Sequence, residues 1–110
     1  MTVSTHVLDA SLGHPAAGVA VTLSRLADGW LDVESGVTDS DGRRRFFADT
    51  PGGTYRLQFA TGAYFAARAV DAFYPEVTVT FTVPQAGTGT GHLHVPLLLS
   101  PFAYSTYRGS

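Results

Sequence analysis

The sequence contains no cysteine and no lysine, and only 15% of its residues are charged. Without cysteine, the chain cannot form a disulfide scaffold, a thiolate nucleophile or a cysteine-based metal site. All seven basic residues are arginine, nine residues are acidic, and the formal net charge is −2. This balance gives no electrostatic reason to expect binding to nucleic acid or to an anionic membrane.

Long apolar runs and a recognisable leader are also missing. No run approaches the roughly 18 apolar residues that a membrane helix needs. Residues 1–6 lack the basic start and the apolar stretch of a signal peptide, so we expect a cytoplasmic location. The 110 residues are 45% hydrophobic, which predicts one compact domain over residues 1–110 with a buried core. A domain this small buries modest surface, and oligomerisation is a common way to bury more.

Alternation of apolar and polar residues is the dominant pattern. Between Val77 and Val83, apolar residues alternate with three threonines, which is typical of a half-buried strand. Turn sequences such as Asp39-Ser-Asp-Gly42 punctuate the pattern, and the Ala-rich segment Gly62–Val70 predicts one short helix. The other predicted strands cover residues 3–8, 19–24, 30–37, 44–47, 55–59, 92–99 and 103–108. About eight short strands with one small helix suggest an all-β sandwich.

His6 lies in the first predicted strand. On that strand it shares a face with Ser4 and Leu8, opposite to Val7. Because histidine is commonly exposed or half-buried, this residue taken alone favours an ordinary surface position over a functional one. We keep it as a candidate site residue.

The segment Thr38-Asp-Ser-Asp-Gly-Arg43 is first of all a turn motif. An EF-hand calcium loop needs a longer series of ligands that ends in Glu, whereas three arginines follow here, so calcium is disfavoured. Arg43 begins the next strand, where its guanidinium could blunt a sheet edge or bind a planar, electron-rich substrate. Alternation places Arg43 and Arg45 on one side and Arg44 on the other, and the sequence leaves open which side faces a site.

His92 and His94 project from the same face of a predicted strand, about 7 Å apart. Metal binding is disfavoured, because zinc needs a third protein ligand and neither cysteine nor an obvious carboxylate is near. A general base is the other use of such a residue, since histidine titrates near neutrality. The chain has no Gly-x-Ser-x-Gly elbow, phosphate loop or dinucleotide fingerprint.

The C-terminal segment Tyr104–Ser110 is aromatic and strand-like. Most chain ends fray and have no function, but a tail that docks into an interface would have this composition. The segment alone fits both interpretations.

Taken together, these segments resemble the transthyretin-related 5-hydroxyisourate hydrolase family over residues 4–110. The terminal Tyr-Arg-Gly-Ser after the His94 segment is the most specific feature, because the thyroid-hormone carrier of this family lacks it. The family commonly has His-Tyr-His where this chain has His92-Leu93-His94, and Arg44 and Arg45 make the turn more basic than usual. The segments that carry the resemblance are Ser4-Thr-His-Val-Leu-Asp9, Pro15-Ala-Ala-Gly-Val19, Thr38-Asp-Ser-Asp-Gly-Arg43, Gly53-Thr-Tyr-Arg56, Phe73-Tyr-Pro-Glu-Val77, His94-Val-Pro-Leu-Leu-Leu-Ser-Pro101 and Tyr104-Ser-Thr-Tyr-Arg-Gly-Ser110.

The resemblance implies a sandwich of two four-stranded sheets with one short helix, assembled as a homotetramer (a dimer of dimers) with active sites in the central channel. It implies hydrolysis of 5-hydroxyisourate to 2-oxo-4-hydroxy-4-carboxy-5-ureidoimidazoline, a cyclic amide hydrolysis in the degradation of urate to allantoin, without a cofactor. The catalytic residues that it implies are His6, Arg43 and His94. The substrate-binding residues that it implies are His6, Arg43, His92, Tyr107, Arg108, Gly109 and Ser110.

Such a hydrolysis needs a positioned water, a base and stabilisation of the charge that develops at the attacked carbonyl. Our hypothesis is that His6 and His94 orient and deprotonate the water, with the identity of the base left open. Arg43 would hold substrate oxygens and stabilise the oxyanion. Tyr107 and Ser110 would close the pocket over the ring.

Two alternatives come from other classes of protein. A carrier of small aromatic ligands could use the same fold and channel, since fold does not decide function. It would have no use for the histidines, Arg43 and the terminal tetrapeptide together. A structural sandwich module of a secreted enzyme would commonly carry an export signal, and we expect none here.

Overall fold

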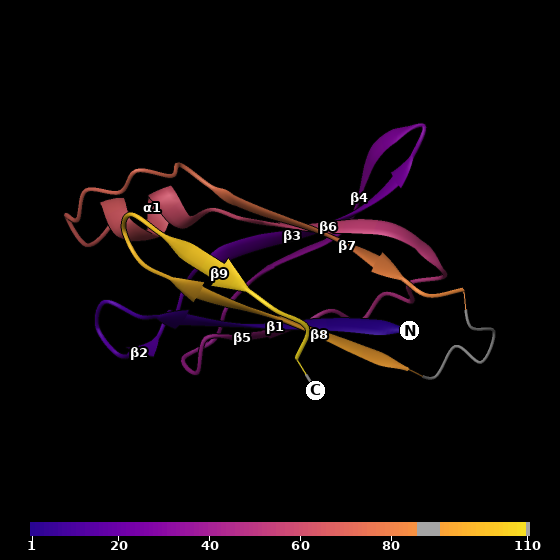
Figure 1. The fold of residues 1–110 in the computed structure, drawn as a ribbon, viewed down its shortest axis with the longest axis horizontal. Coiled ribbons are helices and arrows are strands. Elements are labelled where there is room, and N and C mark those ends of the chain that lie inside the picture. Colours follow the sequence, from indigo (N-terminus) through magenta and orange to yellow (C-terminus); the bar gives the residue numbers. More distant parts are fainter. Residues whose placement is uncertain (86–90, 110) are drawn as a thin grey trace.

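The computed structural model describes residues 1–85 and 91–109, and in this part of the chain two β-sheets pack face to face (Figure 1). Among these residues, the first sheet has five strands and the second has four. The first sheet contains, in order, β2 (His14–Pro15), β1 (Thr2–Asp9), β8 (His92–Leu99) and β9 (Tyr104–Thr106), with β5 (Arg43–Arg45) also paired to β1. The second contains β4 (Gly29–Val37), β3 (Ala20–Ala27), β6 (Gly53–Phe59) and β7 (Val77–Val83). The helix α1 (Thr61–Ala66) follows β6.

The strand β1 organises the first sheet. On one side it pairs in parallel with β8, so that Thr2 lies opposite His92. On the other side it pairs antiparallel with β2 near Asp9 and with β5 around His6. The predicted two-sheet sandwich with one short helix is confirmed for the described residues. Its first sheet has a fifth strand because β2 and β5 share one side of β1.

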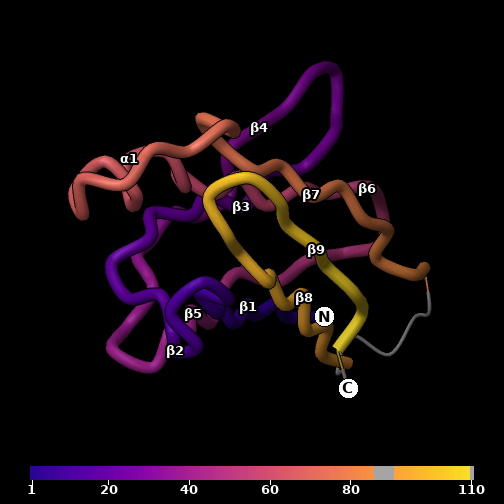
Figure 2. Tube along the Cα trace, turned by 60° about the vertical axis from the view of Figure 1, so that its left-hand side comes forward, coloured from indigo at the N-terminus to yellow at the C-terminus, as the bar shows by residue number. Residues whose placement is uncertain are grey.

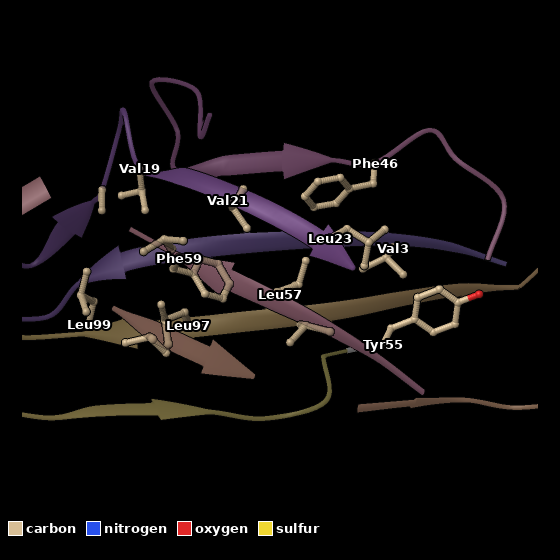
Figure 3. Close-up of a cluster of buried hydrophobic side chains, with 14 of the residues drawn as sticks. Val3, Val19, Val21, Leu23, Phe46, Tyr55, Leu57, Phe59, Leu97 and Leu99 are labelled. Carbon is tan, nitrogen blue, oxygen red and sulfur yellow. The ribbon is translucent and has the colours of Figure 1, made fainter. Parts of the chain in front are cut away.

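The core lies between the two sheets and follows from alternation along each strand. In β1 the odd-numbered residues, such as Val3 and Val7, are buried, and the even-numbered ones are half-buried on the outer face. Leu97 of β8 belongs to the same buried cluster as Leu57 and Phe59 of β6 (Figure 3). Each fully buried side chain of this size stabilises the fold by about 1.5–3 kcal/mol. The outer side chains of β1 and β8 are not needed for this core and are available for a site.

The strand β5 is shorter than the sequence predicts, because it ends at Arg45 and not at Phe47. The carboxylate of Glu34 explains the early end. It accepts hydrogen bonds from the backbone N–H of Phe47 at 3.0 Å and of Ala48 at 2.9 Å. A side chain of the second sheet therefore satisfies donors that a longer strand would have given to a neighbouring strand.

The helix α1 is also shorter than predicted, because it ends at Ala66 and not at Val70. Ala69 has a φ of 57°, and the N–H of Val70 donates to the carbonyl of Phe65 at 3.0 Å while the N–H of Ala69 donates to that of Ala66. These two bonds form a Schellman motif, which ends a helix in a left-handed residue. An Ala-rich composition does not reveal this, since glycine is the usual residue at that place.

The first sheet ends in β9, which is shorter than the strand predicted at residues 103–108. Beyond it the tail turns along β8, as the trace in Figure 2 shows, and Gly109 forms an isolated bridge with His94. No helix within residues 1–85 and 91–109 is long and apolar enough to cross a membrane.

Candidate active site

The outer face of the first sheet gathers the histidines and arginines that the sequence singled out. In β1 and β5 the antiparallel register places His6 opposite Arg43 and Ser4 opposite Arg45. In β1 and β8 the parallel register places Ser4 opposite His94. Residues opposite each other in a sheet lie on the same face. The structure thus brings His6, Arg43 and His94 together on one face, although they come from three separate parts of the chain.

The register also decides which arginines face this site. Arg43 and Arg45 pair with outward residues of β1, whereas Arg44 pairs with the buried Thr5 and points toward the second sheet. There its Nη2 donates to Oε2 of Glu34 at 3.1 Å, and its guanidinium lies 5.5 Å from the ring centroid of Phe46. Two of the three consecutive arginines therefore face the site, and the third holds the two sheets together.

Next to this cluster lies an open hollow of about 480 Å³, which we call the basic hollow and which Arg43 and His94 line, while His6 lies beside it, opposite Arg43. None of the described residues that line it is acidic, so its field favours anionic or oxygen-rich ligands. The planar guanidinium of an arginine suits such ligands, because its donors can bind two oxygens at once. The lining residues are the outward-facing Ser4, Arg43, Arg45, His92 and His94, together with Thr5 and Arg44, which border the hollow although they are paired on the inner side of the sheet.

A chain of hydrogen bonds crosses the floor of the basic hollow. Oγ of Ser4 lies 2.8 Å from Nδ1 of His94 and 2.7 Å from Nε2 of His92. Nδ1 of His92 lies 2.6 Å from Oγ1 of Thr2. Within the described residues, Nε2 of His94 has no hydrogen bond, so it is the ring nitrogen that can meet a ligand or a water.

The surroundings of His94 keep its ring neutral near pH 7. Burial lowers the pKa of His94 below its ordinary value of 6.5, and the positive charges of Arg43, His6 and His92 lower this pKa further. A neutral imidazole can accept a proton, which is what a general base requires. The arrangement can therefore activate a water next to a cationic group.

The predicted tail residues that the structure describes are not among those that line the basic hollow. Tyr107 and Arg108 line a second cavity, of about 280 Å³, between the tail and β7, and His94 belongs to both cavities. The N–H of Gly109 donates to the carbonyl of His94 at 2.8 Å. A Cβ at Gly109 would lie 2.6 Å from Cδ2 of His94, so only glycine lets the tail approach this closely. Ser110 lies outside the described residues.

The described part of the chain contains no group of three or more histidine, aspartate or glutamate side chains that could hold a metal ion. The basic hollow itself offers imidazole, guanidinium and hydroxyl groups.

Ser4 is a site residue for which the sequence analysis predicted no role. Its position on the face of His6 follows from alternation, but its contacts depend on the parallel pairing of β1 with β8. No local pattern predicts that pairing, because the two strands are about as far apart in the sequence as this chain allows. The fold and the basic hollow together define a β-sandwich protein with a histidine- and arginine-lined site for a small, oxygen-rich ligand.

The model of the HIUase/Transthyretin family matches residues 3–109, and the chain belongs to that family. This confirms the resemblance seen in the sequence. The chain is 46% identical to the 5-hydroxyisourate hydrolase of Salmonella dublin over 112 residues, which cover 97% of this chain and 79% of that protein.

Solved structures resemble the fold closely. The 5-hydroxyisourate hydrolase of Klebsiella pneumoniae has a TM-score of 0.87 at 39% identity, with all of both chains covered. The transthyretin of Sparus aurata has a TM-score of 0.88 at 36% identity, covering 97% of this chain and 95% of that one. Because the two resemble this fold equally well, the shape of the sandwich does not separate their functions, and the site has to do so.

Proposed function

We propose that this protein hydrolyses 5-hydroxyisourate to 2-oxo-4-hydroxy-4-carboxy-5-ureidoimidazoline in the degradation of urate. The observation that carries the proposal is the convergence of His6, Arg43 and His94 on one face, with a neutral imidazole beside a guanidinium. Relatives that share 46% and 39% of their residues with this chain are 5-hydroxyisourate hydrolases, which supports the same activity.

The new carboxyl and ureido groups of the product identify the bond that breaks, which is a carbonyl–nitrogen bond of the ring. His94 takes a proton from a water through Nε2, and the water oxygen bonds to the ring carbonyl. Arg43 stabilises the oxyanion that forms, and His6, its neighbour across the strands, orients the water. The carbonyl–nitrogen bond then breaks, and the leaving nitrogen takes the proton back from Nε2 of His94.

The substrate contacts extend beyond these three residues. His92 lines the basic hollow, and Gly109 brings the tail against the ring of His94. We include Tyr107, Arg108 and Ser110 as substrate contacts of the tail. Tyr107 and Arg108 line the smaller cavity, to which His94 also belongs.

We propose a homotetramer as the working form. Among the described strands, β7 and β9 lie at the same edge of the two sheets, and each has an unpaired side. Large apolar side chains are also exposed, among them Leu12 at 56% and Phe102 at 68%. Unpaired strand edges and exposed apolar groups support contacts with further subunits. Light scattering after size exclusion measures the mass of the assembly, and a monomer in dilute solution would contradict the proposal.

The single hydrolase domain over residues 1–110 and the cytoplasmic location remain predictions. Limited proteolysis tests the first, since one domain gives one protected core. Fractionation of the cells that make the protein tests the second.

A carrier of small aromatic ligands is the second candidate, because a sea bream transthyretin of the same fold has been solved with thyroxine. That structure has a TM-score of 0.89 and 35% identity to this chain, covering 97% of this chain and 93% of that one. A carrier has no use for a neutral histidine next to Arg43 in a hollow without acidic lining residues. The site therefore favours hydrolysis.

The deciding measurement is the loss of ultraviolet absorbance of freshly generated 5-hydroxyisourate with and without the protein. We expect a large acceleration that His94→Asn reduces by about 10²–10⁴-fold, the usual contribution of a general base. His14→Asn is the matched control, since His14 lies on the edge strand β2 and its ring, within residues 1–85 and 91–109, is hydrogen-bonded to the carbonyl of Pro15. No acceleration by the folded protein, together with saturable binding of an aromatic ligand, would favour the carrier.

A further inference from the structure

The floor of the basic hollow holds a series of hydrogen bonds that the proton transfers described above do not use. Ser4 lies between the rings of His92 and His94, and the hydroxyl of Thr2 lies next to the other nitrogen of His92 and ends this series of hydrogen bonds. We infer that Ser4 and His92 form a proton relay that moves the charge gained by His94 away from Arg43 to the exposed His92. The inference rests on the proposed function and deepens it.

The relay follows from strand register. Parallel pairing puts Thr2 beside His92 and Ser4 beside His94, all on the outer face. Ser4 is therefore directly opposite His94 and diagonal to His92, and its hydroxyl reaches both rings. The three separations are 2.8, 2.7 and 2.6 Å, all within hydrogen-bond length.

The single hydroxyl proton of Ser4 limits how the chain can be arranged. Ser4 can donate to one histidine only, so it accepts from the other. In one arrangement Nδ1–H of His94 donates to Ser4, Ser4 donates to Nε2 of His92, and Nδ1–H of His92 donates to Thr2. Nε2 of His94 then carries a lone pair and can act as a base. In the opposite arrangement Nε2 carries the proton, and His94 cannot take one from water. The relay requires the first arrangement in the resting enzyme.

The transfer balances in protons and charge. When Nε2 of His94 takes a proton from the water, its Nδ1 proton passes to Ser4 and the proton of Ser4 passes to Nε2 of His92. When the carbonyl–nitrogen bond breaks, the leaving nitrogen takes the proton of Nε2 of His94. The two other protons then return to Ser4 and to Nδ1 of His94, and the chain is restored.

The surrounding charges give the transfer its direction. The half-buried ring of His94 faces His6 from β1, Arg43 and Arg45 from β5, and Tyr107 and Arg108 from the tail. A second positive charge there is repelled and poorly solvated. His92 is exposed, so water screens the same charge.

Three variants separate a relay from a merely structural hydroxyl. Ser4→Ala removes the hydroxyl, and Ser4→Thr keeps it on a residue that suits a strand. His92→Gln keeps an acceptor for Ser4 but cannot take up a proton. Ser35→Ala is the matched control, because this serine lies on the outer face of the second sheet and its hydroxyl, within the described residues, is hydrogen-bonded to Oγ1 of Thr22.

We expect Ser4→Ala and His92→Gln to lower kcat about 10-fold to 100-fold. We also expect the dependence of kcat on pH in both variants to differ from that of the wild type. Ser4→Thr restores both, and Ser35→Ala changes neither. If His92→Gln keeps the wild-type kcat and pH profile while Ser4→Ala does not, Ser4 only positions His94 and the relay is wrong. An effect confined to KM in His92→Gln overturns it equally, because His92 would then act only as the substrate contact proposed above and would carry no proton.

A measurement without substrate keeps this test apart from the proposed function. Nitrogen-15 NMR of the imidazoles in the whole protein reports which ring nitrogen of His94 is protonated. We expect the Nδ1–H tautomer in the wild type and a shift toward Nε2–H in Ser4→Ala. A wild-type Nε2–H tautomer overturns the relay even if the protein hydrolyses 5-hydroxyisourate. An inactive wild type with the Nδ1–H tautomer overturns the function and supports the hydrogen-bonded arrangement.

Discussion

The outer faces of the two sheets make an instructive comparison, because both arise from the same alternation of apolar and polar residues. On the second sheet the polar side chains interact in separate pairs, such as Thr22 with Ser35 and Arg56 over the ring of Trp30. On the first sheet they converge around a hollow and form a continuous hydrogen-bonded chain. Polar outward residues thus become a site only where titratable groups from several strands meet.

The largest contrast is expected between two arginines, one on each outer face. Arg43→Gln removes the cation proposed to stabilise the oxyanion and should lower kcat/KM by about 10²–10³-fold. Arg56→Gln removes the guanidinium that lies 4.2 Å from the ring centroid of Trp30 and should leave kcat/KM within about twofold. Steady-state kinetics on 5-hydroxyisourate measure both. Equal losses in the two variants would mean that the faces do not differ in function.

A second contrast lies between the outer and inner faces of β1. Asp9 is buried and accepts hydrogen bonds from Tyr64 at 2.8 Å and Ser11 at 2.5 Å. Asp9→Asn should lower the free energy of unfolding by about 1–3 kcal/mol, whereas changes at His6 on the outer face should cost less. Urea unfolding measures the difference. A more stable Asp9→Asn protein would show that this buried carboxylate is a net cost.

The same carboxylate predicts a pH dependence of stability. Burial by itself raises the pKa of Asp9, but the hydrogen bonds from Ser11, Tyr64 and the backbone outweigh it and lower the pKa below 3.8. The unfolded state therefore binds a proton first, so the stabilisation is complete above pH 3.8 and is lost as the pH falls through the lowered pKa. Burial and Asp9 also raise the pKa of Tyr64 to about 12. Asp9→Asn should remove this acid-dependent loss.

Glu34 tests the connection between the two sheets. Its carboxylate pairs with Arg44 and accepts from the backbone that follows β5, so it holds in place the strand that carries Arg43. Glu34→Gln should lower the free energy of unfolding by about 1–2 kcal/mol and reduce kcat severalfold. Unfolding and kinetics on the same sample separate the two effects. A stability loss without any change in kcat would show that β5 keeps its place without this anchor.

The smallest expected effect concerns the titration of His94. Because burial and the neighbouring cations lower its pKa, the acid limb of kcat/KM should lie below pH 6.5. Arg43→Gln removes one of these cations, so the pKa of His94 should rise toward its ordinary value. NMR titration of the ring measures this without turnover. An unchanged pKa would mean that Arg43 contributes nothing to the shift.

The sequence predicted the sandwich well because each strand's alternation is a local property. It missed β2 and placed the end of β5 too late, because both depend on partners elsewhere, β1 in the first case and Glu34 in the second. It named His6, Arg43 and His94 through the resemblance to a family, and neither alternation nor spacing alone would have grouped them. It left open which arginines face the site, which only the pairing with β1 answers.

The sequence by itself determined the alternation, the supply of imidazole and guanidinium groups, and the family to which the chain belongs. The tertiary structure decided that these groups meet, that Ser4 joins two histidines, and that Gly109 lies against His94. The physical reason is that alternation specifies only the face on which a side chain lies. Which residues become neighbours on that face depends on strand order and register, and these are set by the packing of the whole core.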